Sequence, residues 1–410
     1  MKILMLNAYF EPEKASSIYL TLNLIEDLVQ KDNEVVLYTP VPTRGVSNEV
    51  RSYYKKEKKE EQLFNGKVKI HRISLIKEVK NVFLRAIRYL LLNFLFIIKA
   101  LKTDADILFL YSTPPTQGLV GGIVKKFKKI PFVYNLQDIF PDSLENTGIA
   151  TKKSIVYKIG RKIEDYTYKK ADRIITISEN FKTNIMNKGV PEKKIDVVYN
   201  WVDEKAVKPI KRCENDLIKK YNLDPKFFYV VYAGNLGKSQ NIDIIFQCAK
   251  QLYKEKIMFI IFGSGTEENY YREKNNKMGL SNLKLFPIEP YEKVSHVYSL
   301  GDICLVTCKK GVGKSGLPSK TWSILSSGSI PIASFDKDSE LEKIINENNL
   351  GGFVNAEDSK ALSEEIVKFY KNQEKNKAIR ENNRKFILDN LSRSASTKKI
   401  ESILKEVIKE

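Results

Sequence analysis

The chain has few of the residues that build metal centres and disulfide frameworks. Its 410 residues include only two histidines, four cysteines and two tryptophans. The histidines, His71 and His296, lie far apart in the sequence, so no histidine-based zinc site is expected. No Cys-x-x-Cys pair occurs. The cysteine pattern therefore excludes a disulfide framework and favours a reducing compartment.

Long hydrophobic segments are also absent. The first ten residues, MKILMLNAYF, have one Lys, a short apolar core and no small-residue cleavage site. They predict a first β-strand and not a signal peptide. The stretch Tyr89–Ile98, YLLLNFLFII, is ten residues long. A helix that spans a membrane requires about 20 residues, so the sequence predicts a cytoplasmic chain.

The composition is that of a folded protein with an excess of positive charge. A length of 410 residues fits two domains of roughly 200 residues each. The chain has 69 Lys and Arg against 50 Asp and Glu, a net charge of +19. Residues 51–102 alone contain 14 basic and four acidic residues. This excess predicts an anionic partner, such as a nucleotide, a phosphorylated substrate, nucleic acid or lipid head groups.

Short apolar runs alternate with helical stretches along the whole chain. Continuous apolar strands separated by helices indicate parallel sheets that are covered on both faces. Residues 198–224 break the alternation and are the predicted linker between two doubly wound α/β domains. The predicted strands are Ile3–Leu6, Glu34–Tyr38, Lys67–Ile73, Ile107–Tyr111, Phe132–Leu136 and Arg173–Ile177, then Phe228–Ala233, Met258–Phe262, Leu283–Phe286, Ile303–Thr307 and Ile330–Ser334.

Residues 79–102 predict a helix that is apolar in the middle and basic at both ends. Arg85, Arg88, Lys99 and Lys102 are expected to meet lipid phosphates while Leu and Phe side chains enter the head-group region. An ordinary buried helix and a spanning helix are the alternatives. Arg72, in the same basic window, is a further candidate for contact with the membrane or an acceptor.

Two glycine-rich turns follow predicted strands of the second half. They are Gly234-Asn235-Leu236-Gly237-Lys238 and Gly263-Ser264-Gly265. Such turns expose backbone N–H groups to phosphate, although glycine is also common there for steric reasons. Glu268 stands where a dinucleotide fingerprint requires glycine, and no P-loop motif occurs, which disfavours a nicotinamide cofactor and a P-loop ATPase.

The segment Gly311–Thr321, GVGKSGLPSKT, is the richest in phosphate-binding groups. It contains Lys314, Ser315, Ser319, Lys320 and Thr321 just after a predicted strand. Two ammonium groups with hydroxyls and backbone donors predict a diphosphate site. A flexible basic loop is the alternative.

Carboxylates occur in two Asp-x-Asp triplets and after one strand of the first half. Asp104 and Asp106 precede their strand, and Asp338 is placed to begin a helix, so no metal is predicted at either triplet. Gln137 and Asp138 directly follow the strand Phe132–Leu136. Asp138 is expected either to orient or deprotonate an acceptor hydroxyl, or to cap the following turn.

Taken in order, these motifs resemble family 4 of the retaining glycosyltransferases, which share the GT-B fold. The matching segments are Ala171–Ser178, Val197–Asp203, Tyr232–Asn241, Phe262–Thr266 and Gly316–Ile332. The segments NLQDIFPDSL (residues 135–144), NWVD (residues 200–203) and GVGKSGLPSK are similar to a bacterial branch that includes L-fucosaminyl and related N-acetylaminosugar transferases.

The resemblance implies an α/β fold of two doubly wound Rossmann-like domains facing a cleft. Residues 1–200 would form the acceptor-side domain, residues 201–385 the nucleotide-sugar-binding domain, and residues 386–410 a helix packing back toward the first domain. The implied reaction is transfer, with retention, of an N-acetylaminosugar such as N-acetylfucosamine from a UDP-sugar to a polyprenyl-pyrophosphate-linked acceptor in capsule or O-antigen synthesis. The chain is then expected on the inner face of the bacterial plasma membrane, without nucleic acid or a metal cofactor, as a monomer or weak dimer.

The resemblance also implies a set of site residues. The family's Glu-x7-Glu pair is absent, and Ser315 and Ser323 occupy its positions; Asn235 and Gln240 replace a basic pair, and Gln137 replaces a histidine. The expected catalytic residues are Asp138, Gln137 and Lys320. The expected nucleotide-sugar ligands are Gly234, Asn235, Lys238, Gly263, Ser264, Gly265, Ile288, Lys314, Ser315, Ser319, Lys320, Thr321 and Ser323.

Two other functions remain open at the level of sequence. A nucleotide-sugar epimerase has the same fold, but it acts on a soluble sugar and has no need of the apolar basic helix. A non-catalytic basic protein that binds nucleic acid or membrane is the other alternative. Against it, no helix-turn-helix, zinc-finger or RRM signature occurs.

Overall fold

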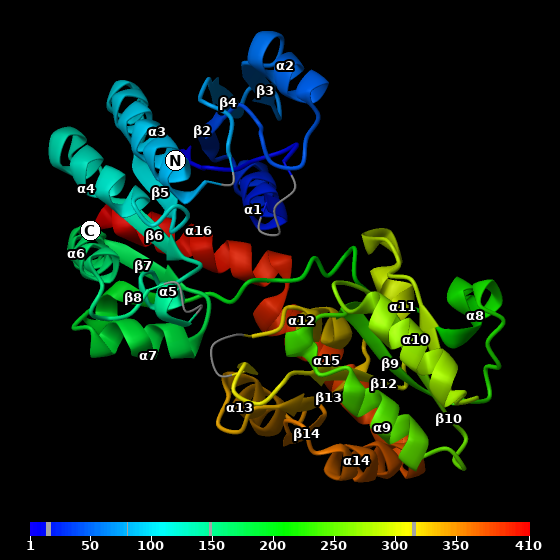
Figure 1. The fold of residues 1–410 in the computed structure, drawn as a ribbon. Coiled ribbons are helices and arrows are strands. Elements are labelled where there is room, and N and C mark those ends of the chain that lie inside the picture. The colour runs from blue at the N-terminus through cyan, green and yellow to red at the C-terminus, as the bar shows by residue number, and fades with distance from the viewer. Residues whose placement is uncertain (14–17, 80, 147–149, 314–316) are drawn as a thin grey trace. The chain divides into compact units, whose positions relative to one another are not determined.

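The computed structural model describes residues 1–13, 18–79, 81–146, 150–313 and 317–410. The chain divides into two compact units, which are described separately. The first consists of Met1–Tyr199 together with Ser396–Glu410, and the second of Asn200–Ala395. Both are α/β units; in Figure 1 residues 1–199 of the first run from blue to green and its residues 396–410 are red, while the second runs from green to red. Residues 386–395, expected to pack back toward the first domain, lie in the second unit.

The first unit is built on an eight-stranded sheet with the order β3-β4-β2-β1-β5-β6-β7-β8. All neighbours pair in parallel except β3 and β4, which are antiparallel. The short strands β3 and β8 were not predicted from the sequence. The bounds are β1 (Lys2–Leu6), β2 (Glu34–Pro40), β3 (Glu60–Leu63), β4 (Val68–Ile73), β5 (Ile107–Tyr111), β6 (Phe132–Leu136), β7 (Arg173–Thr176) and β8 (Ile195–Val197).

Helices cover this sheet because each presents one apolar face to it. On one face, α3, α4 and α6 lie side by side (Figure 1) and pack on alternate residues of the strands, such as Leu4 and Leu108. The helices are α1 (Ile18–Gln30), α2 (Asn48–Lys56), α3 (Val82–Lys102), α4 (Gln117–Lys128), α5 (Asp142–Asn146), α6 (Ile155–Lys170), α7 (Glu179–Asn187), the 3-10 turn η1 (Glu192–Lys194) and α16 (Arg393–Lys409).

The part of α16 that belongs to the first unit makes polar contacts with α1 and with the turn that follows α1. Lys31 Nζ lies 2.9 Å from Glu401 Oε2, and the Thr397 hydroxyl donates to Asp27 Oδ2 at 2.8 Å. Apolar residues of the same helix, Ile400 and Leu404, are fully buried. The chain therefore completes its first unit with its last residues.

The second unit is built on a six-stranded parallel sheet with the order β11-β10-β9-β12-β13-β14. The strands are β9 (Phe228–Asn235), β10 (Ile257–Ser264), β11 (Leu283–Phe286), β12 (Ile303–Thr307), β13 (Ile330–Phe335) and β14 (Gly352–Asn355). Only β14 was not predicted. The remaining elements are η2 (Arg212–Glu214), α8 (Asp216–Lys220), η3 (Lys238–Gln240), α9 (Asp243–Gln251), α10 (Glu268–Met278), η4 (Tyr291–Lys293), α11 (Val294–Leu300), α12 (Lys320–Ser326), α13 (Glu340–Glu347), α14 (Ser359–Lys371), α15 (Gln373–Phe386) and the π-helical turn η6 (Ile387–Leu391).

The strands of both units are nearly continuous in apolar residues because both faces of each sheet are covered. All five residues of β5, β6 and β12 are buried. The prediction of two doubly wound Rossmann-like units is therefore confirmed. Since strands in a doubly wound sheet are parallel, the loops at their carboxyl ends gather on one edge, where such folds bind ligands.

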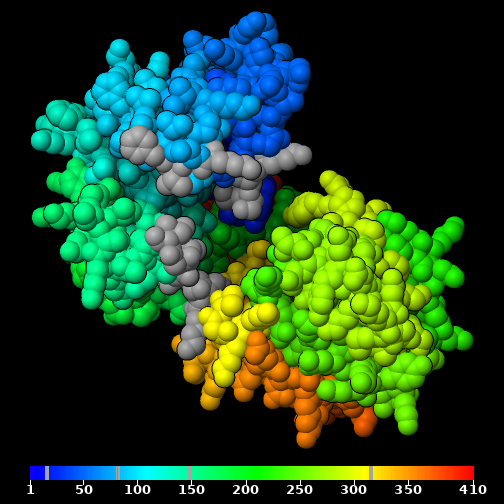
Figure 2. Space-filling view, viewed as in Figure 1, coloured from blue at the N-terminus to red at the C-terminus, as the bar shows by residue number. Residues whose placement is uncertain are grey.

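The helix predicted over residues 79–102 begins at Val82 and continues to Lys102. No helix within the described residues combines the length and apolarity that crossing a bilayer requires. Figure 2 shows the residues of α3 and α4, in light blue to cyan, at the surface of the first unit.

Candidate active site

The two glycine-rich turns of the second unit meet at the carboxyl edge of its sheet. Because β9 and β10 are neighbours in register, Gly234 pairs with Gly263 and Asn235 with Ser264. The Leu236 N–H donates to the Ser264 carbonyl at 2.8 Å. The structure thus brings together two motifs that lie about 30 residues apart in the sequence.

Glycine is required in these turns by backbone conformation and by close packing. Gly234 has φ +144° and Gly265 has φ +157°, values that residues with a side chain rarely adopt. A Cβ atom on Gly265 would lie 2.4 Å from Asn235 Oδ1 and 2.7 Å from the Leu236 carbonyl oxygen. The turns are therefore closed against each other, and their polar backbone groups stand at the edge of the sheet.

Lys320, the first residue of α12, reaches this edge from the segment that follows β12. The residue as a whole is partly exposed, but its Nζ atom is buried and has no hydrogen-bond partner among the described residues. The ammonium lies 4.1 Å from the centre of the Tyr232 ring. A Cβ atom on Gly234 would lie only 2.9 Å from this Nζ, so the turn passes directly beside the ammonium.

Burial lowers the pKa of Lys320 from 10.5 to about 7. The cause is desolvation of the charged form, since no carboxylate of the described residues opposes it. The face of Tyr232 supplies a cation–π contact, which is weaker than an ion pair. An oxyanion at this point would provide the missing hydrogen-bond acceptor and restore the charge of Lys320.

The segment after β12 is held in place by backbone hydrogen bonds. The N–H groups of Gly311 and Gly313 donate to the two carboxylate oxygens of Asp336 at 2.7 and 2.6 Å. The Lys309 N–H donates to the Ser239 carbonyl at 2.9 Å. Lys314 and Ser315, two predicted diphosphate ligands, lie outside the residues that the structure describes.

The other predicted ligands of the second unit occupy different positions around this edge. Ser319 precedes α12 and is exposed, and the Thr321 hydroxyl is buried without a hydrogen-bond partner among the described residues. Ser323 is half-buried within α12. Lys238 is exposed in η3, and Ile288, 49% exposed, follows β11. Sequence reasoning gave Tyr232 no role and considered Asp336, in the triplet that follows the predicted strand Ile330–Ser334, only as a metal ligand. The position of Asp336 directly after that strand was the one signal that it could hold the neighbouring loop.

In the first unit, Gln137 and Asp138 follow β6 and are positioned by Ser112. The Ser112 hydroxyl accepts hydrogen bonds from the N–H of Gln137 at 3.0 Å and of Asp138 at 3.2 Å. The Gln137 side chain donates to Asn135 Oδ1 at 2.8 Å. Asp138 is exposed, and its carboxylate accepts no hydrogen bond from the described residues, so it does not cap the following turn.

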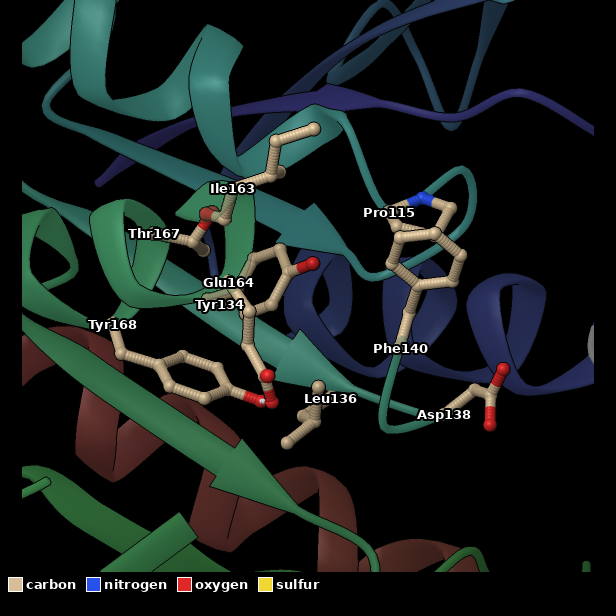
Figure 3. A pocket seen from close by; sticks show the side chains of 9 residues that line it. All are labelled: Pro115, Tyr134, Leu136, Asp138, Phe140, Ile163, Glu164, Thr167 and Tyr168. Carbon is tan, nitrogen blue, oxygen red and sulfur yellow. Dashed lines mark hydrogen bonds between the residues drawn. The ribbon is translucent and has the colours of Figure 1, made fainter. Parts of the chain in front are cut away.

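Asp138 lies at the rim of a small cavity of about 10 Å³, room for about one water molecule (Figure 3). At the other end of this cavity the Tyr168 hydroxyl donates to Glu164 Oε1 at 2.7 Å, and Lys188 Nζ lies 2.9 Å from the same oxygen. The carboxylate of Asp138 points away from this pair in Figure 3. It is therefore available to a group outside the cavity.

The basic residues predicted to face a membrane do not all reach the surface. Arg72 and Arg88 are 3% and 1% exposed, so the expectation that they point toward lipid is wrong. Arg72 is drawn inward by Glu61, whose carboxylate lies 3.0 Å away. Lys99 and Lys102 are exposed, and Arg85 is half-buried.

The carboxylates considered for a metal have other partners. Asp104 lies 2.8 Å from Lys2 Nζ, and Asp106 accepts the Lys2 N–H at 2.6 Å. Asp338 does not cap α13 with its side chain; Ser339 does, by accepting the Glu342 N–H at 3.3 Å. Within the described ranges, no group of three or more His, Cys, Asp or Glu side chains is placed to hold a metal ion.

Comparison with known proteins relates both units to one class of enzyme. The Glycosyltransferase Family 4 model matches residues 19–206, and the Glycosyl transferases group 1 model matches residues 214–386. The chain is 26% identical over 235 residues to the probable glycosyltransferase WbjE of Pseudomonas aeruginosa, a match that covers 57% of this chain and 58% of WbjE. It is 25% identical over 215 residues to the putative colanic acid biosynthesis glycosyl transferase WcaI of Escherichia coli K12, covering 52% of this chain and 53% of WcaI.

Among solved structures, Anabaena Alr3699/HepE in complex with UDP has the same fold. It superposes with a TM-score of 0.70 at 14% identity and covers 99% of this chain and all of its own. The matches to the curated relatives span little more than half of their length, whereas the two family models together extend over both units. We conclude that the chain has the GT-B fold, that its first unit matches the Glycosyltransferase Family 4 model and that its second unit matches the Glycosyl transferases group 1 model.

Proposed function

We propose that the chain is a glycosyltransferase that transfers an N-acetylaminosugar, such as N-acetylfucosamine, from a UDP-sugar to a polyprenyl-pyrophosphate-linked acceptor, with retention at the sugar. The reaction would serve the synthesis of a bacterial capsule or O-antigen. A role in polysaccharide synthesis is supported by the name of WcaI, which refers to colanic acid biosynthesis. A UDP-sugar as the donor is supported by the UDP bound in the HepE complex.

The observation that carries the proposal is the buried ammonium of Lys320. It stands beside the turn of Gly234 without a hydrogen-bond acceptor among the described residues, at the edge where doubly wound sheets bind ligands. A diphosphate placed there would accept a charge-assisted hydrogen bond from Lys320 and further bonds from backbone N–H groups. Lys320 is therefore assigned to the donor diphosphate.

The chemistry follows from where charge develops. When the bond between the sugar and the diphosphate breaks, negative charge grows on the diphosphate, and a preorganised cation beside it lowers the barrier. In transfer with retention, the leaving diphosphate would take the acceptor proton on the same face of the sugar. Asp138, exposed after β6 with no hydrogen bond to its carboxylate from described residues, is assigned to orient the acceptor.

Membrane docking through α3 is the second part of the proposal. The helix exposes Leu84, Leu90, Leu91, Phe94 and Leu101, with Leu90 and Phe94 each 61% exposed. Lys99 and Lys102 are exposed near its end. Apolar side chains that enter the head-group region beside lysines that meet anionic lipid would bind the protein reversibly to the inner face of the plasma membrane.

The donor assignment is tested by incubating the full chain with a panel of nucleotide sugars and following release of the nucleotide. We expect UDP-N-acetylaminosugars to be consumed and Lys320→Ala to lower kcat/KM by a factor that corresponds to about 2–4 kcal/mol of transition-state stabilisation. Lys250, exposed on α9 and remote from the turns, provides the matched control as Lys250→Ala. Near wild-type kcat/KM in Lys320→Ala would contradict the assignment.

Docking is tested by co-sedimentation with vesicles that contain anionic lipid. We expect Phe94→Ser and Lys102→Glu to weaken binding, and added salt to weaken it further, while UDP affinity stays unchanged. Tyr253→Ser, at a tyrosine 52% exposed on the second unit, is the control for loss of an exposed aromatic side chain. Equal binding to neutral and anionic vesicles would contradict the electrostatic part of the proposal.

A further inference from the structure

The loops that follow β1, β2 and β4 bring charged and aromatic side chains to the carboxyl edge of the first sheet. These side chains, with Arg51 of α2 and residues from the first turns of α3, form a group that we call the carboxyl-edge cluster. Its members are Tyr9, Glu13, Arg44, Arg51, Glu78, Arg88 and Tyr89.

Arg88 is the member of the carboxyl-edge cluster whose charge is not matched. Its side chain is 1% exposed, and its Nε donates to the Ile76 carbonyl at 3.1 Å. Both terminal nitrogens are buried without a hydrogen-bond partner among the described residues. Buried guanidinium groups in proteins are normally paired with a carboxylate or satisfied by several acceptors. The two terminal nitrogens of Arg88 are therefore able to donate hydrogen bonds to a bound ligand.

One oxygen of each carboxylate in the cluster accepts hydrogen bonds from other donors, while Glu78 Oε2 is buried without a hydrogen-bond partner among the described residues. Arg44 Nη2 lies 2.9 Å from Glu78 Oε1, which also accepts a hydrogen bond from the Tyr9 hydroxyl at 3.1 Å. Glu13 Oε1 accepts the N–H groups of Thr43 and Arg44 at 2.7 and 2.9 Å. Neither carboxylate forms an ion pair with Arg88.

Arg51 adds a second buried cation close to Arg88. Its guanidinium donates to the carbonyls of Val41, Pro42 and Leu75 at 3.3, 3.0 and 2.9 Å. Burial and the charge of Arg88 lower the pKa of Arg51, while Glu13 acts in the opposite direction. With Arg44, the carboxyl-edge cluster contains three guanidinium groups against the two carboxylates of Glu13 and Glu78, which leaves an excess of positive charge at this edge.

A purely structural role does not explain this arrangement. Replacing a buried charged group with an apolar side chain of similar size is often neutral or stabilising, because the desolvation of the charge is avoided. The single hydrogen bond to the Ile76 carbonyl stabilises the fold by less than the desolvation of a buried guanidinium destabilises it. A group that destabilises the fold and keeps two donors open is typical of a binding residue.

We propose that Arg88 binds an oxyanion of the acceptor through its two terminal nitrogens. The planar guanidinium matches the two oxygens of a phosphate or carboxylate, which a lysine does not. The proposal rests on the proposed function in that the acceptor approaches the first unit. Ile76, whose carbonyl Arg88 contacts, is 51% exposed, so the guanidinium lies directly beneath a surface segment, residues 74–79, that contains no helix or strand.

The oxyanion has two possible sources with the same chemistry. One is the diphosphate of a lipid-linked acceptor, and the other is the carboxylate of an acidic sugar in the acceptor. Calorimetric titrations with inorganic pyrophosphate and with glucuronate distinguish them. The full chain is saturated with UDP first, so that pyrophosphate does not report on the donor site.

We expect wild-type protein to bind at least one probe and Arg88→Met to bind that probe about ten- to hundredfold more weakly, as loss of a charge-assisted pair predicts. Arg88→Lys keeps the charge without the planar fork and should give an intermediate affinity. Lys69→Met, which removes an exposed positive charge from β4, is the matched control and should bind as wild type. Probe affinity that is equal in Arg88→Met and wild type, or no binding of either probe to wild type, would overturn the proposal.

Thermal unfolding of the same variants separates a binding residue from a structural one. If Arg88 binds an oxyanion, Arg88→Met should have a Tm equal to or above that of wild type, because an unpaired buried charge is removed. A clear fall in Tm, or failure to fold, would overturn the proposal by making Arg88 a structural cation. UDP affinity, measured in the first step, tests the proposed function separately: loss of that binding refutes the donor assignment, whereas loss of probe binding alone refutes only this inference.

Discussion

Lys320 should couple UDP binding to proton uptake. With a pKa of about 7, half of the Lys320 side chains are neutral near neutral pH in the chain without donor. A diphosphate favours the charged form and raises the pKa toward its ordinary value of 10.5. A proton must therefore be taken up by those molecules in which Lys320 is neutral before UDP binds.

The pH dependence of UDP affinity follows from this change in the pKa of Lys320. Above pH 7 the affinity for UDP should fall about tenfold for each unit of pH, until the pKa of Lys320 in the complex is reached. The last proton of a phosphate monoester leaves near pH 6, so the charge of UDP itself changes little above about pH 7.5. Isothermal titration calorimetry between about pH 7.5 and pH 9.5, in buffers of different ionisation enthalpy, measures both the affinity and the number of protons taken up.

Lys320→Met supplies the comparison. At pH 7 it should bind UDP about ten- to hundredfold more weakly than wild type, and its affinity should not change between about pH 7.5 and pH 9.5. Lys250→Met, at an exposed lysine of α9, should behave as wild type. A wild-type affinity that is independent of pH above 7, with no proton uptake, would refute the reasoning that Lys320 lies against the diphosphate.

As the pH rises, the free energy of unfolding should increase while the affinity for UDP decreases. Because the pKa of Lys320 is lowered in the folded state, the unfolded chain binds more protons between about pH 7 and pH 10.5. The free energy of unfolding of wild type therefore rises with pH in this window, and the penalty for the buried charge is fully present below pH 7. Lys320→Met should raise Tm relative to wild type at pH 6 more than at pH 9, as scanning calorimetry would detect.

Three further predictions follow from the site residues. Asp138→Asn should lower the rate of transfer by about 10²–10⁴-fold if its carboxylate acts on the acceptor hydroxyl, while calorimetric UDP affinity stays unchanged; collapse of UDP binding in a folded variant would contradict this role. Gly265→Ala should weaken UDP binding and lower Tm, the latter by an amount that corresponds to roughly 1–3 kcal/mol of strain. The reason is that the new Cβ would lie 2.4 Å from Asn235 Oδ1 and that the residue has φ +157°. Unchanged UDP affinity would show that the turn tolerates displacement. Activity should survive EDTA, since Asp104, Asp106 and Asp336 have other partners; activity lost with EDTA and restored by Mg²⁺ or Mn²⁺ would contradict metal independence.

The sequence alone determined the fold because its periodicity is strong. Runs such as residues 107–111 and 132–136 are apolar throughout, and only a parallel sheet covered on both faces accounts for a series of such runs separated by helices. The strands β3, β8 and β14 escaped prediction because they are short and lie at or near sheet edges, where burial imposes little pattern. Local turn chemistry likewise identified the glycine-rich turns and Lys320 as one group, since each follows a strand of the same half.

Only the tertiary structure decided how the charged side chains are used. The sequence placed Arg85, Arg88, Lys99 and Lys102 on one basic apolar helix, but it could not tell which of its faces packs on the sheet. The fold turns Arg88 inward with Leu92 and Phe96 and leaves Leu90 and Phe94 at the surface. Helical periodicity predicts that these two sets lie on different faces, but burial depends on the strands opposite, which are distant in sequence. The same is true of Lys320, whose burial beside Tyr232 and Gly234 depends on a strand about 90 residues earlier in the chain.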